Sequence, residues 1–430
     1  MLDYTLPFST RNDRLFQWYG LHQSRYQPQK YFCEKYADGI LIGKGWVELS
    51  GVTEGGYQVF FSQNLGEFFG DLQNTPMNLL DFGSASTVPK LSYDYTTDAA
   101  AFPTVKNIAF YGDNQNPDFA GYVNKTVAGV YSASGPLVPM VGLPHVFREL
   151  ARMCKVRFEG AFFQSDWYTR GLLDNVFSLD GRTNIEYKNH LYSLTIPDFL
   201  KEIAKLANCV LYIDTVNRLV RVEFRETKMR QATTLNLTEK TLPGRAKSPD
   251  RNTRLELDWV LDGADKLMKV VPTDFVKYQT PGQDERFFKV KTLFSTRLID
   301  PATGLAMAEQ IGITSLFNQQ AGPFTPKLLF WNGIIGGVPT GTNQHGDLRL
   351  AWHGTKSLVQ NWSHFEAFRA KTAPRTLSVR LTPADLARLD YHTTGGYDSA
   401  VHIQGRDFYI DSIRVNLPVT GYATVKLWEK

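Results

Sequence analysis

The sequence predicts a β-rich protein of the α+β class with more than one domain. Apolar and polar residues alternate in short runs near both ends of the chain, and two segments between them have helical periodicity. Aromatic residues make up 13% of the 430 residues, and 34 Gly and 21 Pro supply turns, which favours short strands with tight connections. At about 150 residues per domain, this length allows two to four domains.

The N-terminal part is expected to be mostly β structure. Within 31–61, two β-prone runs are separated by the Gly-containing stretch 51–56, which is typical of a hairpin. Residues 73–143 are interrupted by proline, glycine and Asx residues. We therefore expect loops and brief strands there, for example at 105–111.

Two segments predict amphipathic helices. Residues 144–154 and 197–207 both have apolar side chains at positions i, i+1, i+4, i+5, i+7 and i+8, and each runs into a β-prone stretch. The likeness indicates either an internal duplication or two independent helices that resemble each other. We expect both apolar faces to be buried, and the helices to lie at the periphery or between domains.

The middle of the chain is a mixture of strands and loops. Two runs around residue 216 predict a hairpin over 209–225, and the polar stretch 238–254 indicates a long solvated loop or a boundary. Further strands are expected at 254–261, 274–278 and 287–294, and a Gly-rich loop at 331–347.

The C-terminal part has the clearest pattern. A helix is expected at 356–371, followed by a strand at 375–381. Thr382, Pro383 and Asp385 have the order of an N-cap, an N1 proline and an acidic N3 residue, so a helical turn should begin there. An antiparallel meander should follow, with strands at 401–403, 408–417 and 423–427.

Composition excludes several classes of protein. With 47 basic and 43 acidic residues, the net charge of +4 provides no electrostatic basis for binding nucleic acid or an anionic membrane. No run of eighteen apolar residues occurs, so no membrane-spanning helix is expected. The N-terminus has no apolar core of a signal peptide, which predicts synthesis in a cytoplasm. Cys33, Cys154 and Cys209 lie far apart and are expected to be buried, reduced thiols.

The sequence predicts no catalytic, cofactor-binding or metal-binding residues. It contains no nucleophile elbow, zinc-protease or phosphate-loop motif. Three groups of residues were weighed as sites and interpreted as ordinary structure: His345, Asp347 and His353 as surface groups, Asp258, Asp262 and Asp265 as a strand end with a solvated turn, and 113–118 as an Asx-turn. Trp46, Trp259, Trp362 and Trp428 lie within strand or helix patterns and are expected in the core or at an interface.

Several phrases, in order along the chain, resemble structural tail proteins of tailed bacteriophages and prophages. They begin with LPFSTRN at 6–12 and the helix at 144–154 followed by VRFEG. They continue with WVLDGAD at 259–265, KVKTLFST at 289–296 and PKLLFWNG at 326–333, in which Lys327 stands where arginine is more usual. The closing helix at 358–368 and the hairpin at 401–410 complete the set.

The resemblance implies a baseplate hub or tail-tip protein. Such hubs combine two small β-barrel-like domains per subunit with helix-bearing domains, and a homotrimer then forms a ring with six-fold pseudo-symmetry that matches the tail tube. The implied location is the virion tail, and the implied partners are the tail tube and other baseplate or tail-tip proteins. Neither nucleic-acid specificity nor stable membrane insertion is expected.

The predicted domains are an N-terminal barrel-like domain over 1–140, a helix–strand domain over 141–250 and a C-terminal β-rich domain over 251–430. Two other functions remain open at this point. One is a carbohydrate-binding tail protein that recognises a host surface through exposed aromatic residues. The other is an enzyme such as a peptidoglycan hydrolase, which would need two convergent carboxylates in a cleft.

Overall fold

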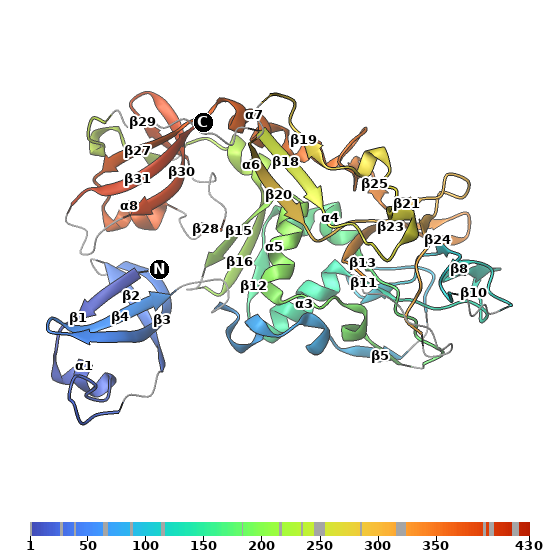
Figure 1. Ribbon diagram of the computed structural model, residues 1–430, viewed down its shortest axis with the longest axis horizontal. Helices are drawn as coiled ribbons and strands as arrows, with labels where there is room; N and C mark the ends of the chain where they lie inside the picture. Colours follow the sequence, from blue (N-terminus) through green and yellow to red (C-terminus); the bar gives the residue numbers. More distant parts are fainter. Residues whose placement is uncertain are drawn as a thin grey trace.

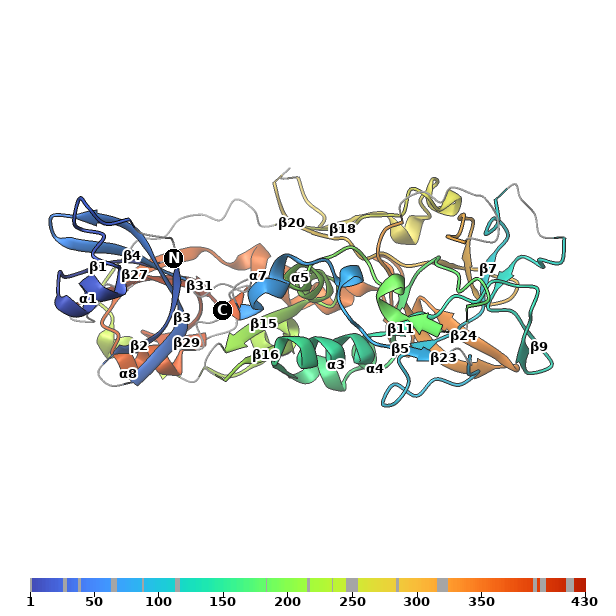
Figure 2. The same cartoon turned by 90° about the horizontal axis from the view of Figure 1, so that it is seen from below.

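The computed structural model has 22% helix and 38% strand, which confirms the predicted β-rich α+β multidomain class. The molecule is elongated, and the β units from the two ends of the chain lie together at one end of it (Figures 1 and 2). The structure describes residues 2–25, 29–37, 40–62, 68–86, 89–112, 117–182, 184–214, 217–233, 235–244, 254–283, 286–314, 324–389, 393–394, 400–414 and 421–430.

The N-terminal unit is a four-stranded antiparallel sheet with one short helix, α1 (Thr10–Leu15). The predicted hairpin is confirmed, and a strand at the very N-terminus, which the sequence did not signal, pairs with it. In spatial order the strands are β1 (Leu2–Leu6), β4 (Gly56–Ser62), β3 (Ile40–Thr53) and β2 (Lys30–Ala37).

The C-terminal unit is a five-stranded sheet that closes on itself. Its strands are, in spatial order, β17 (Leu235–Asn236), β29 (Ala400–Ile403), β30 (Arg406–Arg414), β31 (Ala423–Glu429) and β27 (Pro374–Val379). After β17, the chain turns through η5 (Thr238–Lys240), and Thr241 then bridges Val379 of β27. The segment that begins with the outer strand β17 therefore also contacts the opposite outer strand, β27, so the unit is a small barrel. The predicted meander is confirmed within it.

The barrel is completed by α8 (Pro383–Arg388). The side chain of Thr382 accepts from the backbone N–H of Asp385, and the Asp385 carboxylate accepts from the backbone N–H of Thr382. This is the capping arrangement that the sequence predicted. Helix α8 also contacts β3, so the two terminal units touch.

The body of the molecule contains three larger sheets. The first has the order β24 (Val338–Thr342), β23 (Lys327–Ile335), β13 (Gly171–Asp174), β11 (Met140–Gly142) and β6 (Ala100–Ala101). The second has the order β12 (Arg157–Glu159), β16 (Leu219–Phe224), β15 (Cys209–Asp214) and β28 (Thr393–Thr394). The third has the order β19 (Tyr278–Gln279), β18 (Arg254–Trp259) and β20 (Phe287–Thr292).

Smaller sheets surround this body. One has the order β21 (Leu298–Ile299), β22 (Ala306–Ala308), β7 (Val105–Asn107) and β8 (Tyr122–Val123). Three are two-stranded: β5 (Ser84–Ser86) with β14 (Asn184–Glu186), β9 (Thr126–Val127) with β10 (Val130–Tyr131), and β25 (Gln344–His345) with β26 (Leu348–Arg349). The first large sheet joins strands from both sides of residues 140 and 250. The predicted domain boundaries at those residues stay predictions.

The two predicted amphipathic helices are present as α3 (Leu143–Cys154) and α5 (Ile196–Leu206). Their apolar faces are buried, as predicted: Leu150 is 0% and Ile203 is 3% exposed, and both belong to the largest core cluster. The helices are therefore not peripheral. Helix α5 contacts both β15 and β20 and so lies between two sheets (Figure 1).

The remaining helices are short. Four of them are α4 (Asp166–Thr169), α6 (Arg225–Arg230), the 3-10 helix η8 (Leu358–Trp362) and α7 (Ser363–Lys371). The predicted helix at 356–371 thus begins as 3-10 and continues as α. Further 3-10 turns are η1 (Gly70–Asn74), η2 (Met77–Leu79), η3 (Ala161–Gln164), η4 (Tyr187–His190), η6 (Lys266–Met268) and η7 (Thr273–Phe275).

Two sequence predictions are wrong. The Gly-rich stretch 331–347 is mostly not a loop: it contains the end of β23, the turn at Gly336 and Gly337, and then β24 and β25. Both glycines have positive φ, 58° and 81°, the backbone that a two-residue hairpin turn requires. The strand predicted over 274–278 is largely the 3-10 turn η7, because Pro272 precedes it. Of the polar stretch 238–254, residues 245–253 lie outside the described residues.

Candidate functional site

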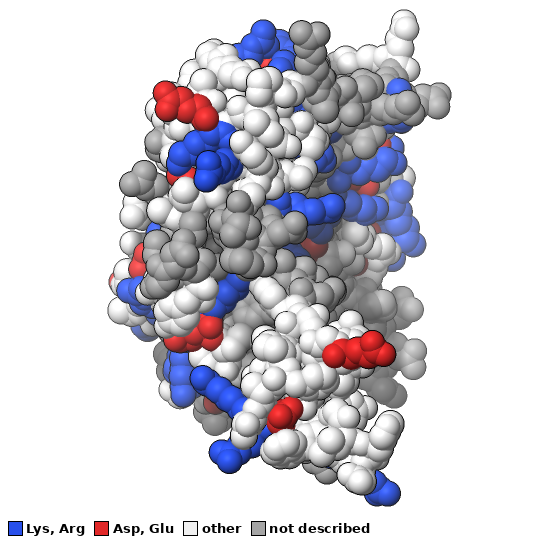
Figure 3. Space-filling model, turned by 90° about the vertical axis from the view of Figure 1, so that its left-hand side faces the viewer, with Lys and Arg blue, Asp and Glu red and all other residues white. Residues whose placement is uncertain are grey.

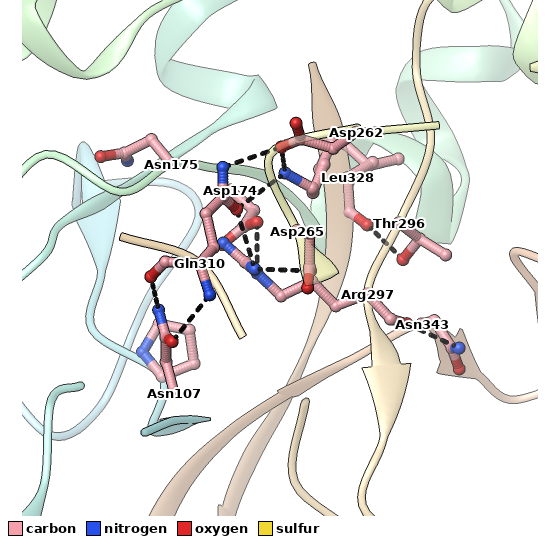
Figure 4. Close-up of polar contacts among 12 residues, drawn as sticks. Asn107, Asp174, Asn175, Asp262, Asp265, Thr296, Arg297, Gln310, Leu328 and Asn343 are labelled. Atoms are coloured by element: carbon pink, nitrogen blue, oxygen red, sulfur yellow. Dashed lines mark hydrogen bonds and ion pairs between the residues drawn. The ribbon is translucent and has the colours of Figure 1, made fainter. Parts of the chain in front are cut away.

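Five charged side chains from distant parts of the sequence meet inside the body (Figure 4). Asp262 and Asp265 lie in the turn after β18, and Arg297 follows β20 by five residues. Lys327 begins β23, and Asp174 ends β13. None of the five is more than 2% exposed. We call these five residues the buried charge network.

The network consists of two connected ion-pair groups. The Nε atom of Arg297 lies 2.6 Å from the Oδ2 atom of Asp174, and its Nη1 atom lies 3.5 Å from Oδ2 of Asp265. The ammonium of Lys327 donates to Oδ2 of Asp262. The amide of Gln310 joins the groups: its Nε2 donates to Asp262 at 2.9 Å, and its Oε1 accepts from Lys327 at 3.3 Å and from Nη1 of Arg297 at 3.5 Å.

Hydrogen bonds to the main chain hold the network in place. The Oδ1 atom of Asp265 accepts from the backbone N–H of Glu309 at 3.0 Å, and Asn107 and Gln310 exchange two bonds of 2.8 and 3.1 Å. The side chain of Asn343 donates to the carbonyl of Arg297 at 3.0 Å. These hydrogen bonds connect the network to strands β7, β13 and β23 and to the loop after β24. They help to hold these short strands together in the body of the molecule.

Burial and charge count set the ionisation of this network. Three carboxylates face two cations, and burial raises the pKa of Asp174. Burial and the neighbouring Arg297 guanidinium lower the pKa of Lys327. Burial also opposes the charge of Arg297, but Asp174 and Asp265 outweigh it and raise the pKa of this guanidinium. An unpaired charge at such a site costs about 3–5 kcal/mol, so each partner depends on the others.

The network is structural. A catalytic or ligand-binding group must contact a molecule from solution, and these five side chains have almost no contact with solvent. Four of its five members come from three of the phrases that resemble phage tail proteins or from residues next to them: WVLDGAD supplies two aspartates, Arg297 directly follows KVKTLFST, and PKLLFWNG supplies Lys327, whereas Asp174 lies in none of the phrases. The lysine that stands in place of the more usual arginine therefore still pairs with a buried carboxylate.

The interpretation of Asp262 and Asp265 as part of a solvated turn is wrong, because both side chains are buried in ion pairs. Asp258 is separate from them and pairs with Lys291 at 3.3 Å on the surface. One signal for the network was present in the sequence. Lys327 precedes the apolar run LLFW, and a lysine in such a run needs a buried partner.

The three residues weighed as metal ligands each contact a different partner. The Nδ1 atom of His345 lies 2.7 Å from Oδ1 of Asn332, Asp347 pairs with Lys356 at 2.8 Å, and His353 lies 3.3 Å from the carbonyl of Lys277. Within the described ranges, no group of three or more His, Cys, Asp or Glu residues could hold a metal ion. Residues 113–116 of the Asx-rich segment lie outside those ranges.

The predicted environments of the cysteine and tryptophan side chains are mostly confirmed. All three cysteines are free, with Cys154 and Cys209 buried and Cys33 half-buried. Burial raises the pKa of Cys154 to about 11, which makes it a poor nucleophile. Trp259, Trp362 and Trp428 are buried, whereas Trp46 is half-buried against Phe32. In the part of the chain that the structure describes, no helix is long and apolar enough to cross a membrane.

The surface of the N-terminal unit is rich in exposed apolar side chains. They are Phe8, Leu15, Trp18, Tyr19, Leu21, Phe32 and Tyr36. A depression of about 960 Å³ lies between α1 and β2, and Arg11, Arg14 and Lys30 contribute to its walls. Seen from this end of the molecule, uncharged surface is extensive and interrupted by separate basic and acidic side chains (Figure 3). Such a surface is typical of a region that contacts other proteins.

Comparison with solved structures gives structural likenesses. No known family matches the sequence, and no curated protein matches it. Among solved structures, the chain is similar to the 43 kDa tail protein of prophage MuSo2 from Shewanella oneidensis, with 9% sequence identity and a TM-score of 0.37. The alignment covers 99% of this chain and 87% of that protein. A TM-score this low does not establish a shared fold, so a function must be argued from the residues of this chain.

Proposed function

We propose that this chain is a structural component of a bacteriophage tail, and that it acts as a hub or tail-tip protein joining the tail tube to distal parts. In this role it works through shape and symmetry and performs no catalysis. Its location is then the virion tail, and its partners are the tail tube and other baseplate or tail-tip proteins.

The observation that carries the proposal is the position of the two terminal β units. One is built from the first 62 residues and the other mainly from the last 57, yet they lie side by side at one end of the molecule and touch through α8 and β3 (Figures 1 and 2). The sequence resemblance implies two such units per subunit. Three subunits would then place six β units around one axis, which is the number that a hexameric tube requires.

A second support is the agreement between resemblance and packing. The phrases that resemble tail proteins could have been scattered over the surface, where a chance match would have no structural consequence. Instead, three of them converge on the buried charge network. The residues that carry the resemblance are therefore the residues that build the body of this protein.

The exposed apolar side chains of the N-terminal unit are a third support. A monomer in water gains nothing from exposing Phe32 and Leu21, which are 58% and 53% exposed. In a ring, neighbouring subunits would cover such side chains and the burial would stabilise the assembly. We therefore propose that the subunit interface is at the end of the molecule where both β units lie.

Mass measurement of the full-length protein by light scattering tests the proposal. A ring-forming trimer has three times the monomer mass of 48.7 kDa. Quantitative mass spectrometry of intact particles should give three copies of the chain per tail, and electron microscopy should place them at the distal end of the tube. A monomer at all concentrations that is absent from purified particles would overturn both the hub and the tail assignment.

One observation favours a second candidate, a carbohydrate-binding tail protein. Trp18 is 45% exposed and has a positive φ of 56°, an unusual backbone for a tryptophan, and Tyr19 next to it is also exposed. Exposed aromatic rings can stack on sugars. Titration of the protein with host-surface oligosaccharides, followed by tryptophan fluorescence, distinguishes the candidates: a saturable change that Trp18→Ala abolishes favours the carbohydrate binder.

A further inference from the structure

A cavity of about 470 Å³ lies between α5, β15, β20 and the helical segment η8–α7. Its floor is apolar and includes Ala204, Leu211, Trp362 and Phe365, all of which are buried. Its rim is basic. The five cationic residues that line it are Lys201, Lys205, Arg225, Lys289 and Lys291, and among the described residues no aspartate or glutamate lines it.

The cavity follows the edge of a sheet. Strand β20 is the outermost strand of the sheet β19–β18–β20, and in the described part of the chain no strand pairs with its other side. Four consecutive residues of β20, 288–291, line the cavity. Successive side chains of a strand point to opposite faces of the sheet, so only a cavity that runs along the strand edge can contact all four.

From these features we propose that the cavity binds an extended acidic peptide segment of a partner protein, which adds as a strand to the edge of β20. The backbone of the peptide would pair with β20, and its carboxylates would contact the basic rim. Its apolar side chains would cover Trp362 and Phe365. This inference goes beyond the proposed tail function and holds whether or not the chain belongs to a tail.

Charge complementarity identifies the chemistry of the occupant. The four rim lysines now pair with acidic side chains outside the cavity: Lys201 with Asp198, Lys205 with Glu202, Lys289 with Glu256 and Lys291 with Asp258. These lysine side chains remain 42–67% exposed. Lys201 and Lys291 pair with carboxylates that are themselves 53% and 29% exposed, and such pairs contribute little free energy, so a carboxylate on a bound peptide can replace Asp198 or Asp258 at small cost. Glu202 and Glu256 are only 8% and 11% exposed, so Lys205 and Lys289 would keep these partners and attract the peptide through their remaining exposed surface.

The floor of the cavity supplies a second polar feature. The indole N–H of Trp362 is buried and has no hydrogen-bond acceptor among the described residues. A peptide carbonyl that enters the cavity would bring an acceptor close to it. A fatty acid or a phospholipid would carry its charge at one end only, whereas the basic residues here are distributed along both α5 and β20.

Calorimetric titration of the full-length protein tests the proposal. The probe is a synthetic peptide in which Val and Glu alternate, and its controls are the same peptide with Gln in place of Glu and the same peptide with alternate backbone nitrogens methylated. We expect saturable binding of the Glu peptide only. The Gln peptide tests the charge, and the methylated peptide tests the backbone pairing, since a methylated nitrogen cannot donate to β20.

Variants locate the site. The double variant Lys289→Glu, Lys291→Glu should weaken binding by about tenfold or more, because like charges then face each other along the groove. Lys266→Glu is the matched control, since Lys266 is a half-exposed lysine that pairs with Glu309 at 3.0 Å outside the groove. Equal circular dichroism spectra and melting temperatures exclude misfolding as the cause. The fluorescence of Trp362 should also change on binding, and Trp362→Phe should remove that change.

Four outcomes overturn the proposal. The first is absence of binding by the Glu peptide, and the second is equal binding by the Glu and methylated peptides. The third is equal loss of binding in Lys266→Glu and in the double variant, which would indicate non-specific attraction. Saturable binding of oleate or of phosphatidylglycerol vesicles in place of the peptide would assign the cavity to a lipid instead and would likewise overturn it.

Discussion

The two β units at the ends of the chain touch each other but differ in how they are completed. In the C-terminal barrel, thirteen apolar side chains form one buried cluster. The segment that continues from the outer strand β17 bridges to the other outer strand, β27, and so closes the sheet. In the N-terminal sheet, only Phe16, Tyr57 and Val59 form a buried cluster among the described side chains. Further apolar side chains of this sheet, such as Tyr31, Val47 and Leu49, are only partly buried against it.

The difference shows what closure does for a small β unit. A closed barrel buries both outer strands and its whole inner face within one chain, so its core needs nothing else. An open four-stranded sheet has too little interior for the same number of apolar side chains. We therefore expect substitutions in the N-terminal unit to affect assembly more than folding.

The largest expected loss of unfolding free energy comes from the buried charge network in the body. It is measured by replacing lysine with methionine at one buried and one exposed position. Lys327→Met leaves Asp262 buried without its cation and should cost about 3–5 kcal/mol of unfolding free energy. Lys30→Met in the N-terminal sheet removes the exposed pair with Glu48 at 2.7 Å and should cost about 0–1 kcal/mol. Chemical denaturation of both variants measures the difference, and equal costs would contradict the sealed environment of Lys327.

The cores of the two units can be compared by removing one leucine side chain from each. Leu427→Ala in the barrel, at a position that is 0% exposed, should destabilise that unit by about 2–5 kcal/mol. Leu49→Ala in the N-terminal sheet, where the side chain is only partly buried, should cost about 1 kcal/mol. Hydrogen exchange read by mass spectrometry assigns each loss to its own unit. A larger loss for Leu49 would mean that the N-terminal unit is the better packed one.

Acid should weaken the barrel through Asp385. Burial opposes the charge of this carboxylate, but the Lys240 ammonium at 2.6 Å and the Thr382 hydrogen bonds outweigh it and hold its pKa below the usual value. Because the folded-state pKa is the lower one, the stabilisation is present above the unfolded pKa, near about 4, and is lost as the pH falls through the folded pKa. Asp385→Asn should cost about 1–3 kcal/mol at pH 7.

Below about pH 4 the loss of unfolding free energy caused by Asp385→Asn should shrink, because residue 385 is then uncharged in the wild type as well as in the variant. Unfolding of the barrel, followed by hydrogen exchange at several pH values, checks this prediction. A cost that stays constant with pH would show that the carboxylate contributes through shape alone. Asp13→Asn, next to Tyr57 in the N-terminal unit, serves as the comparison in the other β unit.

Helix caps provide a smaller comparison. Thr382→Ala removes the capping arrangement of α8 and should destabilise the barrel by about 1 kcal/mol. Ser9→Ala removes the cap of α1, whose Oγ accepts from the backbone N–H of Asn12 at 3.2 Å. Because α1 has no buried residues, its cap should matter less. Melting temperatures of the two variants give the order, and the reverse order would show that α1 is more strongly packed than its exposure indicates.

The smallest effect on folding should come from the exposed aromatic surface. Phe32→Ser should change the free energy of unfolding by about 0.5 kcal/mol or less, since the side chain is already largely in water. It should nevertheless reduce assembly in the light-scattering measurement. Val270→Ser is the control, because Val270 is 84% exposed on the body, away from the terminal units. If both variants assemble like the wild type, the N-terminal surface is not the interface.

Local patterns predicted the elements that depend on short-range chemistry. The faces of α3 and α5, the capping residues of α8 and the C-terminal meander all follow from periodicity or from residues three or four apart. The hairpin over 327–342 was missed, although Gly336 and Gly337 are the residues that its turn requires. There, a high glycine content was taken as evidence of a loop.

The buried charge network could be predicted only in part. Lys327 before an apolar run indicated that some buried carboxylate was needed, but Asp262 lies 65 residues away and Asp174 lies 153 residues away in the chain. Nothing in a single sequence identifies such partners, because ion pairing depends on distance in space. The cavity beside β20 was not foreseen for the same reason, since its walls come from four separate segments.

The sequence by itself determined the β-rich class, the amphipathic helices, the caps and the strands of the C-terminal meander, because side-chain periodicity and backbone preferences act over a few residues. Only the tertiary structure decided that the C-terminal sheet closes while, among the described residues, the outer strands β1 and β2 of the N-terminal sheet do not pair, and that five distant charges share one buried site. Closure and burial depend on which segments meet in space, and a charge is stable inside a protein only when that meeting supplies its partner.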